Sequence, residues 1–225
     1  MNLTASILHL DRAAIKALRI TDSYSLHRVV YSLYEDSRSR AEKAASLSSG
    51  ILYADQGGDF NSRKILLLAN RIPSEQAEGG HGQVVSKPIN DNFLTHERYR
   101  FKVIVNPTKR DPKRRESFSE QKSRSGKLIP LKGREAVATW FAERAPASWG
   151  FAVSLEHLQV DRIDVLQFND KAQNPVTLAQ AHISGQLQVT DQTLFQKSFA
   201  QGIGRGRAFG CGLLQIIPLI DNPFA

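Results

Sequence analysis

Near its end the chain reads Gly202-Ile203-Gly204-Arg205-Gly206-Arg207-Ala208-Phe209-Gly210-Cys211-Gly212, which we call the glycine-rich loop. Five glycines in eleven residues indicate a backbone that approaches something closely or takes positive φ angles. Two arginines project from the same run, and their guanidinium groups suit an anionic ligand. The pattern favours anion binding or close domain packing over a plain connection between a helix and a strand.

Two common phosphate-binding motifs do not fit this loop. A dinucleotide fingerprint needs glycines at i, i+2 and i+5, after a strand and before a helix. The third position is Arg207 when counting starts at Gly202, and it is Phe209 when counting starts at Gly204. The order of the flanking elements is also reversed. A Walker loop is excluded because no Gly-Lys-Ser/Thr ends the run.

Hydrophobic periodicity predicts the elements around the loop. A helix over 191–201, capped by Asp191, precedes it, and a strand over 213–219 follows it. The other predicted elements are strands at 5–10, 50–53, 63–69, 99–105, 151–168 and 182–189, helices at 22–35 and 133–144, and a loop at 74–91. Each half mixes antiparallel-looking strands with one or two helices. The sequence therefore predicts an α+β fold of two ferredoxin-like (RRM-like) domains in tandem.

The positive charge is concentrated in the middle of the chain. The 225 residues carry a net charge of +8, and the segment 109–134 holds ten basic against three acidic residues. A concentrated positive field suits a polyanion, because each neutralised phosphate releases counterions. A solvated linker explains the charge equally well. We expect an N-terminal domain at 1–108, a basic loop or linker at 109–130 and a C-terminal domain at 131–225.

Composition also excludes several classes. Cys211 is the one cysteine, so neither an internal disulfide nor a thiolate zinc site is expected. The histidines show no i, i+4 pairing, which argues against a histidine metal site. Apolar runs are too short for a membrane span, and Asp11 and Arg12 interrupt the N-terminal apolar residues. We expect a soluble, cytoplasmic protein without a cofactor.

The helix at 22–35 carries a histidine away from its apolar side. The apolar stripe consists of Leu26, Val29, Val30 and Leu33, at i, i+3, i+4 and i+7. A second stripe, displaced by roughly 120°, consists of Tyr24, His27, Tyr31 and Tyr34. Tyr24 and His27 lie one turn apart and can share a ligand. Periodicity alone favours an exposed histidine beside tyrosines that flank the core.

Together these features resemble the CasE-type CRISPR repeat endoribonucleases of the wider Cas six superfamily. The segment Tyr24-x-Leu26-His27 is similar to the family's catalytic segment. Gly202-Ile203-Gly204 and Gly210-Cys211-Gly212, five residues apart, match the superfamily's glycine signature. The strand that ends in Asn106-Pro107 before a basic stretch resembles the family's mid-chain region.

The resemblance implies metal-independent cleavage of CRISPR repeat RNA beside its stem-loop. The RNA 2′-hydroxyl would be the nucleophile, leaving a 5′-hydroxyl and a 2′,3′-cyclic phosphate, and the enzyme would stay on its product within a multi-protein CRISPR effector complex. His27 would act as acid or base, Tyr24 would orient it, and Arg205 or a lysine would offset developing charge. The expected RNA-binding residues are Lys109, Arg110, Lys113, Arg114, Arg115, Lys122, Arg124, Lys127, Arg205 and Arg207.

Two other interpretations stay open at this point. The chain could be a non-catalytic RNA-binding subunit of a CRISPR ribonucleoprotein, with the fold but without turnover. It could also be a globular protein with a basic linker and no role in RNA binding.

Overall fold

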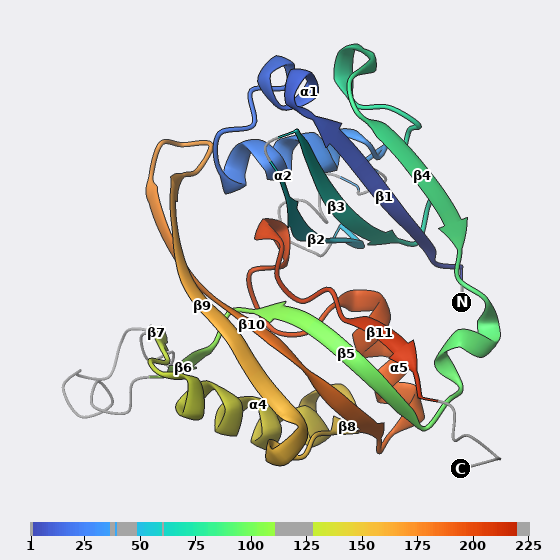
Figure 1. The fold of residues 1–225 in the computed structure, drawn as a ribbon, viewed down its shortest axis with the longest axis vertical. Coiled ribbons are helices and arrows are strands. Elements are labelled where there is room, and N and C mark those ends of the chain that lie inside the picture. The colour runs from blue at the N-terminus through green and yellow to red at the C-terminus, as the bar shows by residue number, and fades with distance from the viewer. Residues whose placement is uncertain (1, 37–38, 40–48, 60, 111–127, 220–225) are drawn as a thin grey trace.

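The computed structural model describes residues 2–36, 39, 49–59, 61–110 and 128–219. It contains two antiparallel sheets, one above the other in Figure 1, with the glycine-rich loop between them. None of the described helices is long and apolar enough to cross a membrane.

The first sheet is built from the N-terminal residues. Its strands are β1 (Thr4–Asp11), β2 (Ile51–Gly58), β3 (Ser62–Ala69) and β4 (Gln83–Pro88), in the order β2-β3-β1-β4. The β1–β3 register runs from Thr4 opposite Ala69 to Asp11 opposite Ser62. Helices α1 (Arg12–Ala17) and α2 (Ser23–Ser32) connect β1 to β2. This is the ferredoxin-like strand order, with the 3-10 turn η1 (Glu78–Gly80) in the position of the second helix.

The second sheet repeats this order. Its strands are β5 (Arg98–Val105), β8 (Phe151–Ala152), β9 (Leu158–Asn169), β10 (Pro175–Val189) and β11 (Gln215–Pro218). The order is β11-β5-β10, and both β8 and β9 pair with the far edge of β10. Helix α4 (Arg134–Trp149) follows β5 in the chain, and α5 (Gln192–Gln201) follows β10. The predicted tandem of ferredoxin-like domains is therefore confirmed.

Three details differ from the sequence-based expectation. The segment 74–91, expected as a loop, contains β4, whose side chains are nearly all exposed at a sheet edge and therefore show no alternation. The short helix α1 was not expected. Strand β5 pairs with β10 and β11, so the first sheet ends at Pro88 and the second begins at Arg98, upstream of the expected division at residue 108.

A smaller antiparallel pair joins β6 (Thr108–Arg110) to β7 (Leu128–Pro130). The segment between them, 111–127, lies outside the described residues. Further 3-10 turns lie at η2 (Asp91–Leu94), η4 (Leu155–His157) and η5 (Arg207–Phe209).

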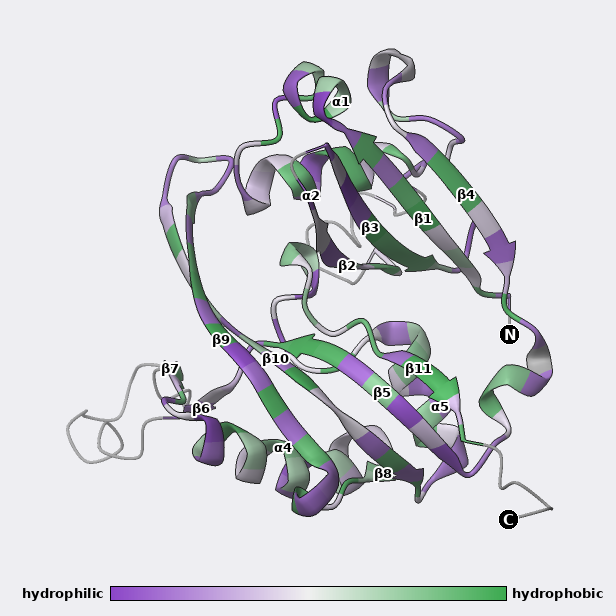
Figure 2. Cartoon of the chain, viewed as in Figure 1, coloured by the Kyte–Doolittle hydropathy of each residue, from purple (hydrophilic) through white to green (hydrophobic). Residues whose placement is uncertain are grey.

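Two apolar cores hold the sheets and helices together. The first lies between α1, α2 and one face of the first sheet, where Leu26, Val30 and Tyr53 are buried. The second lies between α4, α5 and the second sheet, and it extends to Leu52 and Leu68 on the other face of the first sheet. Hydrophilic and hydrophobic residues alternate along β5, as a strand with one buried face requires (Figure 2). The shared second core fixes the two domains against each other.

Candidate active site

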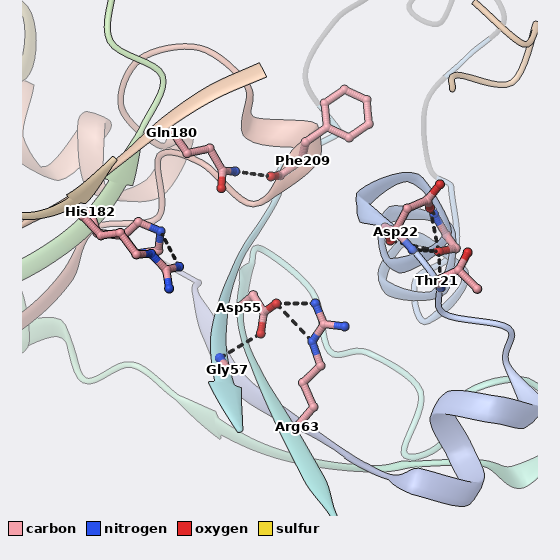
Figure 3. A network of polar contacts seen from close by, with 10 residues as sticks. Thr21, Asp22, Asp55, Gly57, Arg63, Gln180, His182 and Phe209 are labelled. Atoms are coloured by element: carbon pink, nitrogen blue, oxygen red, sulfur yellow. Dashed lines mark hydrogen bonds and ion pairs between the residues drawn. The ribbon is translucent and has the colours of Figure 1, made fainter. Parts of the chain in front are cut away.

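Helix α2 begins with a capping box that fixes the position of its first turn. The Asp22 carboxylate accepts a hydrogen bond from the Ser25 backbone N–H at 2.8 Å, and the Ser25 hydroxyl accepts one from the Asp22 N–H at 2.9 Å (Figure 3). These bonds satisfy donors that a helix start leaves unpaired. Since Leu26 and Val30 are buried against the first sheet, His27 faces sideways, toward the glycine-rich loop.

At two positions of the loop, close approach of neighbouring atoms requires glycine. Gly202 has φ +77°, and a Cβ there would lie 2.6 Å from a Leu52 methyl group on β2. Gly212 has φ +86°, and a Cβ there would overlap the carbonyl oxygen of Ile203. The Ile203 N–H donates to the Gly212 carbonyl at 2.9 Å, and the Gly212 N–H donates to Ile104 on β5 at 2.7 Å. The loop is thus closed at its base and packed between the two domains.

The loop presents one carbonyl oxygen to the first domain. Nδ1 of His27 lies 2.8 Å from the Ala208 carbonyl oxygen, and the Tyr53 hydroxyl donates to the same oxygen at 3.0 Å. A carbonyl can only accept, so Nδ1 carries the proton of the neutral imidazole. Nε2 of neutral His27 is therefore the unprotonated nitrogen, whose lone pair can accept a proton.

Aromatic side chains surround the half-buried imidazole. Its ring centroid lies 4.0 Å from that of Tyr31, 5.6 Å from Phe209 and 6.1 Å from Tyr24. Burial lowers the pKa of His27, and the hydrogen bond to Ala208 opposes that shift. The neutral ring is the form that this environment favours near pH 7.

A pocket of about 660 Å³ opens beside Tyr24, one helical turn before His27. It lies between the start of α2 and the tip of the β9–β10 hairpin, and its lining includes Asp22, Tyr24 and Phe168. The Phe168 ring packs on that of Phe209 at 4.6 Å between centroids. The hairpin and the start of α2 therefore border the pocket, and the glycine-rich loop contacts the hairpin through Phe209.

The two arginines of the loop differ in their surroundings. Arg207 donates from Nη1 to the Gln201 carbonyl at 2.7 Å and from Nε to Gly204 at 3.2 Å. It thereby satisfies an unpaired carbonyl at the end of α5. Arg205 is exposed. The Nε and Nη1 groups of Arg207 stabilise the loop through these two hydrogen bonds. RNA binding by either arginine stays a prediction.

The other expected RNA-binding residues lie far from α2 in sequence. Lys109 and Arg110 are exposed on β6. The remaining six lie outside the described residues, namely Lys113, Arg114, Arg115, Lys122, Arg124 and Lys127. Among the described residues, no group of three or more His, Cys, Asp or Glu side chains is arranged to hold a metal ion.

Tyr53 and Gln180 support the site but gave no signal in the sequence. The Gln180 side-chain amide donates to the Phe209 carbonyl at 3.1 Å and lies 3.4 Å from the Cys211 sulfur (Figure 3). Tyr53 and Gln180 come from different sheets, and both bind carbonyls of the glycine-rich loop. Only the folded chain brings them together.

The chain thus has two tandem ferredoxin-like domains, with a glycine-rich loop packed against a histidine-bearing helix. A family model described as CRISPR associated protein matches residues 1–218. The chain therefore belongs to this family of CRISPR-associated proteins, and the predicted family is confirmed.

Solved structures share the fold at low sequence identity. Thermus thermophilus Cse3, bound to an RNA representing a pre-cleavage complex, is 21% identical with a TM-score of 0.74 over 97% of this chain and 100% of that chain. Cas6e from Escherichia coli K-12 is 16% identical with a TM-score of 0.58 over 96% of this chain and 100% of its own. A chain of a CRISPR RNA-guided surveillance complex is 21% identical with a TM-score of 0.63, over 96% and 100%. A comparison with curated protein sequences finds no significant match.

Proposed function

We propose that this protein is an endoribonuclease that cuts CRISPR repeat RNA beside its stem-loop. The observation that carries the proposal is the histidine whose Nδ1 lies 2.8 Å from the Ala208 carbonyl oxygen, which leaves Nε2 as the unprotonated nitrogen of the neutral ring. The likeness to Cse3, solved with an RNA that represents a pre-cleavage complex, supports RNA as the substrate.

The proposed reaction uses the RNA's own 2′-hydroxyl. Neutral His27 accepts the proton of that hydroxyl at Nε2, and the 2′ oxygen attacks the adjacent phosphorus. The bond from phosphorus to the 5′ oxygen breaks, and the leaving oxygen takes a proton from water. The products are a 2′,3′-cyclic phosphate and a 5′-hydroxyl, and the step needs no metal ion. The Ala208 carbonyl stabilises the imidazolium that forms, because it accepts from Nδ1.

Tyr24 and Arg205 have supporting roles in this proposal. The Tyr24 ring lies one turn before His27 and lines the adjoining pocket, so it can orient the imidazole or bond the phosphate. Arg205 is exposed on the loop that holds His27, where its charge can offset that of the phosphate.

The decisive experiment replaces the histidine and keeps the RNA. His27→Ala should lower the cleavage rate by about 10²–10⁴-fold, the usual value of a general base, with RNA affinity unchanged and with EDTA present. His9→Ala, on the exposed face of β1, is the matched control and should cut normally. A 2′-deoxy nucleotide at the cut should block cleavage of bound RNA. Wild-type cleavage by His27→Ala would overturn the mechanism, and intact RNA with the wild-type protein would favour a non-catalytic RNA-binding subunit.

We further propose that the protein remains on its stem-loop product as a subunit of a CRISPR complex in the cytoplasm. The matched chain from an RNA-guided surveillance complex supports this assignment. The basic segment at 109–130 would supply phosphate contacts, since it starts and ends on the paired strands β6 and β7. A strong salt dependence of repeat-RNA affinity, reduced when the basic residues between β6 and β7 are neutralised, is the expected result.

A further inference from the structure

The second sheet has a face that the helices do not cover. On β5 the side chains of Tyr99, Phe101 and Val103 are buried with α4 and α5, whereas those of Arg100 and Lys102 are exposed on the opposite face. We call the exposed side chains of Arg100 and Lys102, with their cross-strand neighbours, the cationic strand face. No part of the glycine-rich loop and no residue of the basic segment belongs to it.

The neighbours of these cations are mostly polar and uncharged. Lys102 lies between Ser184 on β10 and Gln215 on β11. Arg100 lies between Gln186 on β10 and Ile217 on β11. Three of these four neighbours can form hydrogen bonds and the fourth, Ile217, is an exposed apolar residue; no carboxylate lies directly opposite either cation.

The nearest carboxylates are already engaged. Asp164 on β9 binds Nε of Arg162 at 2.6 Å and lies 3.3 Å from Nε2 of His182. Asp161 accepts from the Ser184 hydroxyl at 2.9 Å. On the first sheet, Asp55 of β2 forms an ion pair with Arg63 of β3. Asp161 keeps its charge and lines the adjoining pocket, but the three cations Arg100, Lys102 and Arg162 outnumber the two carboxylates Asp161 and Asp164, so the face keeps a net positive charge.

A pocket adjoins this face between the two sheets. Its volume is about 390 Å³, and its lining includes Lys102, Arg162, His182, Gln215 and Asp55. The His182 and Asp55 side chains approach it from different sheets (Figure 3). This volume lies in the usual range for small-ligand pockets, so it suits one or two unpaired nucleotides and excludes a duplex.

The face continues toward the candidate active site. Gln180 precedes His182 by two positions on β10 and therefore points to the same face. Its amide holds the Phe209 carbonyl, next to the Ala208 carbonyl that binds His27. Gln180 is buried beneath the loop, so it connects β10 to the candidate active site through the fold and is not itself an exposed contact for RNA.

The spacing of the cations suits an extended strand. Alternate residues on a β-strand are about 6.8 Å apart, so Arg100 and Lys102 can contact different phosphates of one extended strand. We propose that the cationic strand face binds the sugar–phosphate backbone of unpaired RNA adjoining the stem, chiefly through Arg100 and Lys102. This inference rests on the proposed function. Because the face carries cations and amides in place of stacking aromatic rings, it contacts the backbone without reading sequence.

Two RNAs and two double variants test the proposal. The first RNA is the full repeat with its unpaired flanks, and the second is trimmed to the stem and the nucleotides at the cut. Both carry a 2′-deoxy nucleotide at the cut, so that only binding is measured. The variants are Arg100→Gln with Lys102→Gln and, as the control of equal charge change, Lys64→Gln with Lys87→Gln on exposed positions of the first sheet.

We expect the Arg100/Lys102 variant to bind the full repeat about 10–100-fold more weakly, with the salt slope reduced by about 1.4, since each phosphate contact on a single strand contributes about 0.7. Its affinity for the trimmed RNA should match that of wild type, and the control should bind both RNAs normally. Equal weakening for both RNAs, or no difference from the control, overturns the proposal. The test measures RNA affinity and not cleavage. Its result therefore does not depend on whether His27 is the general base.

Discussion

The glycine-rich loop can be tested at Gly212, because a side chain there meets a backbone atom. The residue has φ +86°, and the Cβ of alanine would overlap the Ile203 carbonyl oxygen. A left-handed conformation costs about 1–2 kcal/mol for a residue with a Cβ. Relief of the overlap also strains the bonds from Ile203 N–H to Gly212 and from Gly212 N–H to Ile104, each contributing about 0.5–1.5 kcal/mol. Gly212→Ala should therefore lower the free energy of unfolding by about 3 kcal/mol.

Gly204 provides the matched control within the same loop. It also has a positive φ, +71°, but nothing lies within 4 Å of the position that a Cβ would take. Gly204→Ala should therefore cost only the conformational penalty, about 1 kcal/mol.

Thermal unfolding followed by circular dichroism separates the two variants. For a chain of this size about 1 kcal/mol corresponds to about 2–4 °C, so Gly212→Ala should melt about 6–12 °C below wild type and Gly204→Ala about 2–4 °C below. Urea unfolding should give the same ranking. Equal melting temperatures for the two variants would refute the close approach on which the loop's geometry depends.

Further predictions concern the residues around the loop. Tyr53→Phe removes one of two donors to the Ala208 carbonyl and should cost about 1 kcal/mol in urea unfolding while cleavage persists, because His27 still binds that oxygen. Asp22→Ala removes the N-cap of α2 and should cost about 0.5–2 kcal/mol in the same assay. Burial lowers the pKa of His27, so the unfolded chain takes up its proton first, and stability should decline as pH falls below about 6.5 and decline less in His27→Gln. Burial raises the pKa of the Cys211 thiol to about 12, so a thiol reagent should label native protein only at the rate of opening and label urea-unfolded protein at once.

Much of the candidate site could be predicted from local sequence. The period of α2 showed that His27 lies off the apolar stripe, and the glycine spacing marked the loop. The resemblance to CasE-type enzymes connected these two segments, and the structure places His27 Nδ1 2.8 Å from the Ala208 carbonyl. Periodicity alone favoured an exposed histidine, whereas the ring is half-buried among aromatic side chains, because the loop that covers it comes from the far end of the chain.

Other features depend on pairing that local patterns do not encode. β4 has almost no buried side chains, so its strand character comes from hydrogen bonding to β1. The sequence predicted β5 as a strand of the N-terminal domain. Its partners β10 and β11 lie much later in the chain, so it belongs to the second sheet. The sequence showed that polar and apolar side chains alternate along β5. Which surface the polar ones form depends on the sheet that β5 belongs to.

The contact between His27 and Ala208 spans 181 positions of the chain. During translation the ribosome therefore completes α2 well before it adds the carbonyl that orients its imidazole. A nascent polypeptide that stops after α5 could still pair β1 with β3, yet it would lack the partner of His27. Under the proposed mechanism, translation products that stop before Ala208 therefore lack the group that orients the general base.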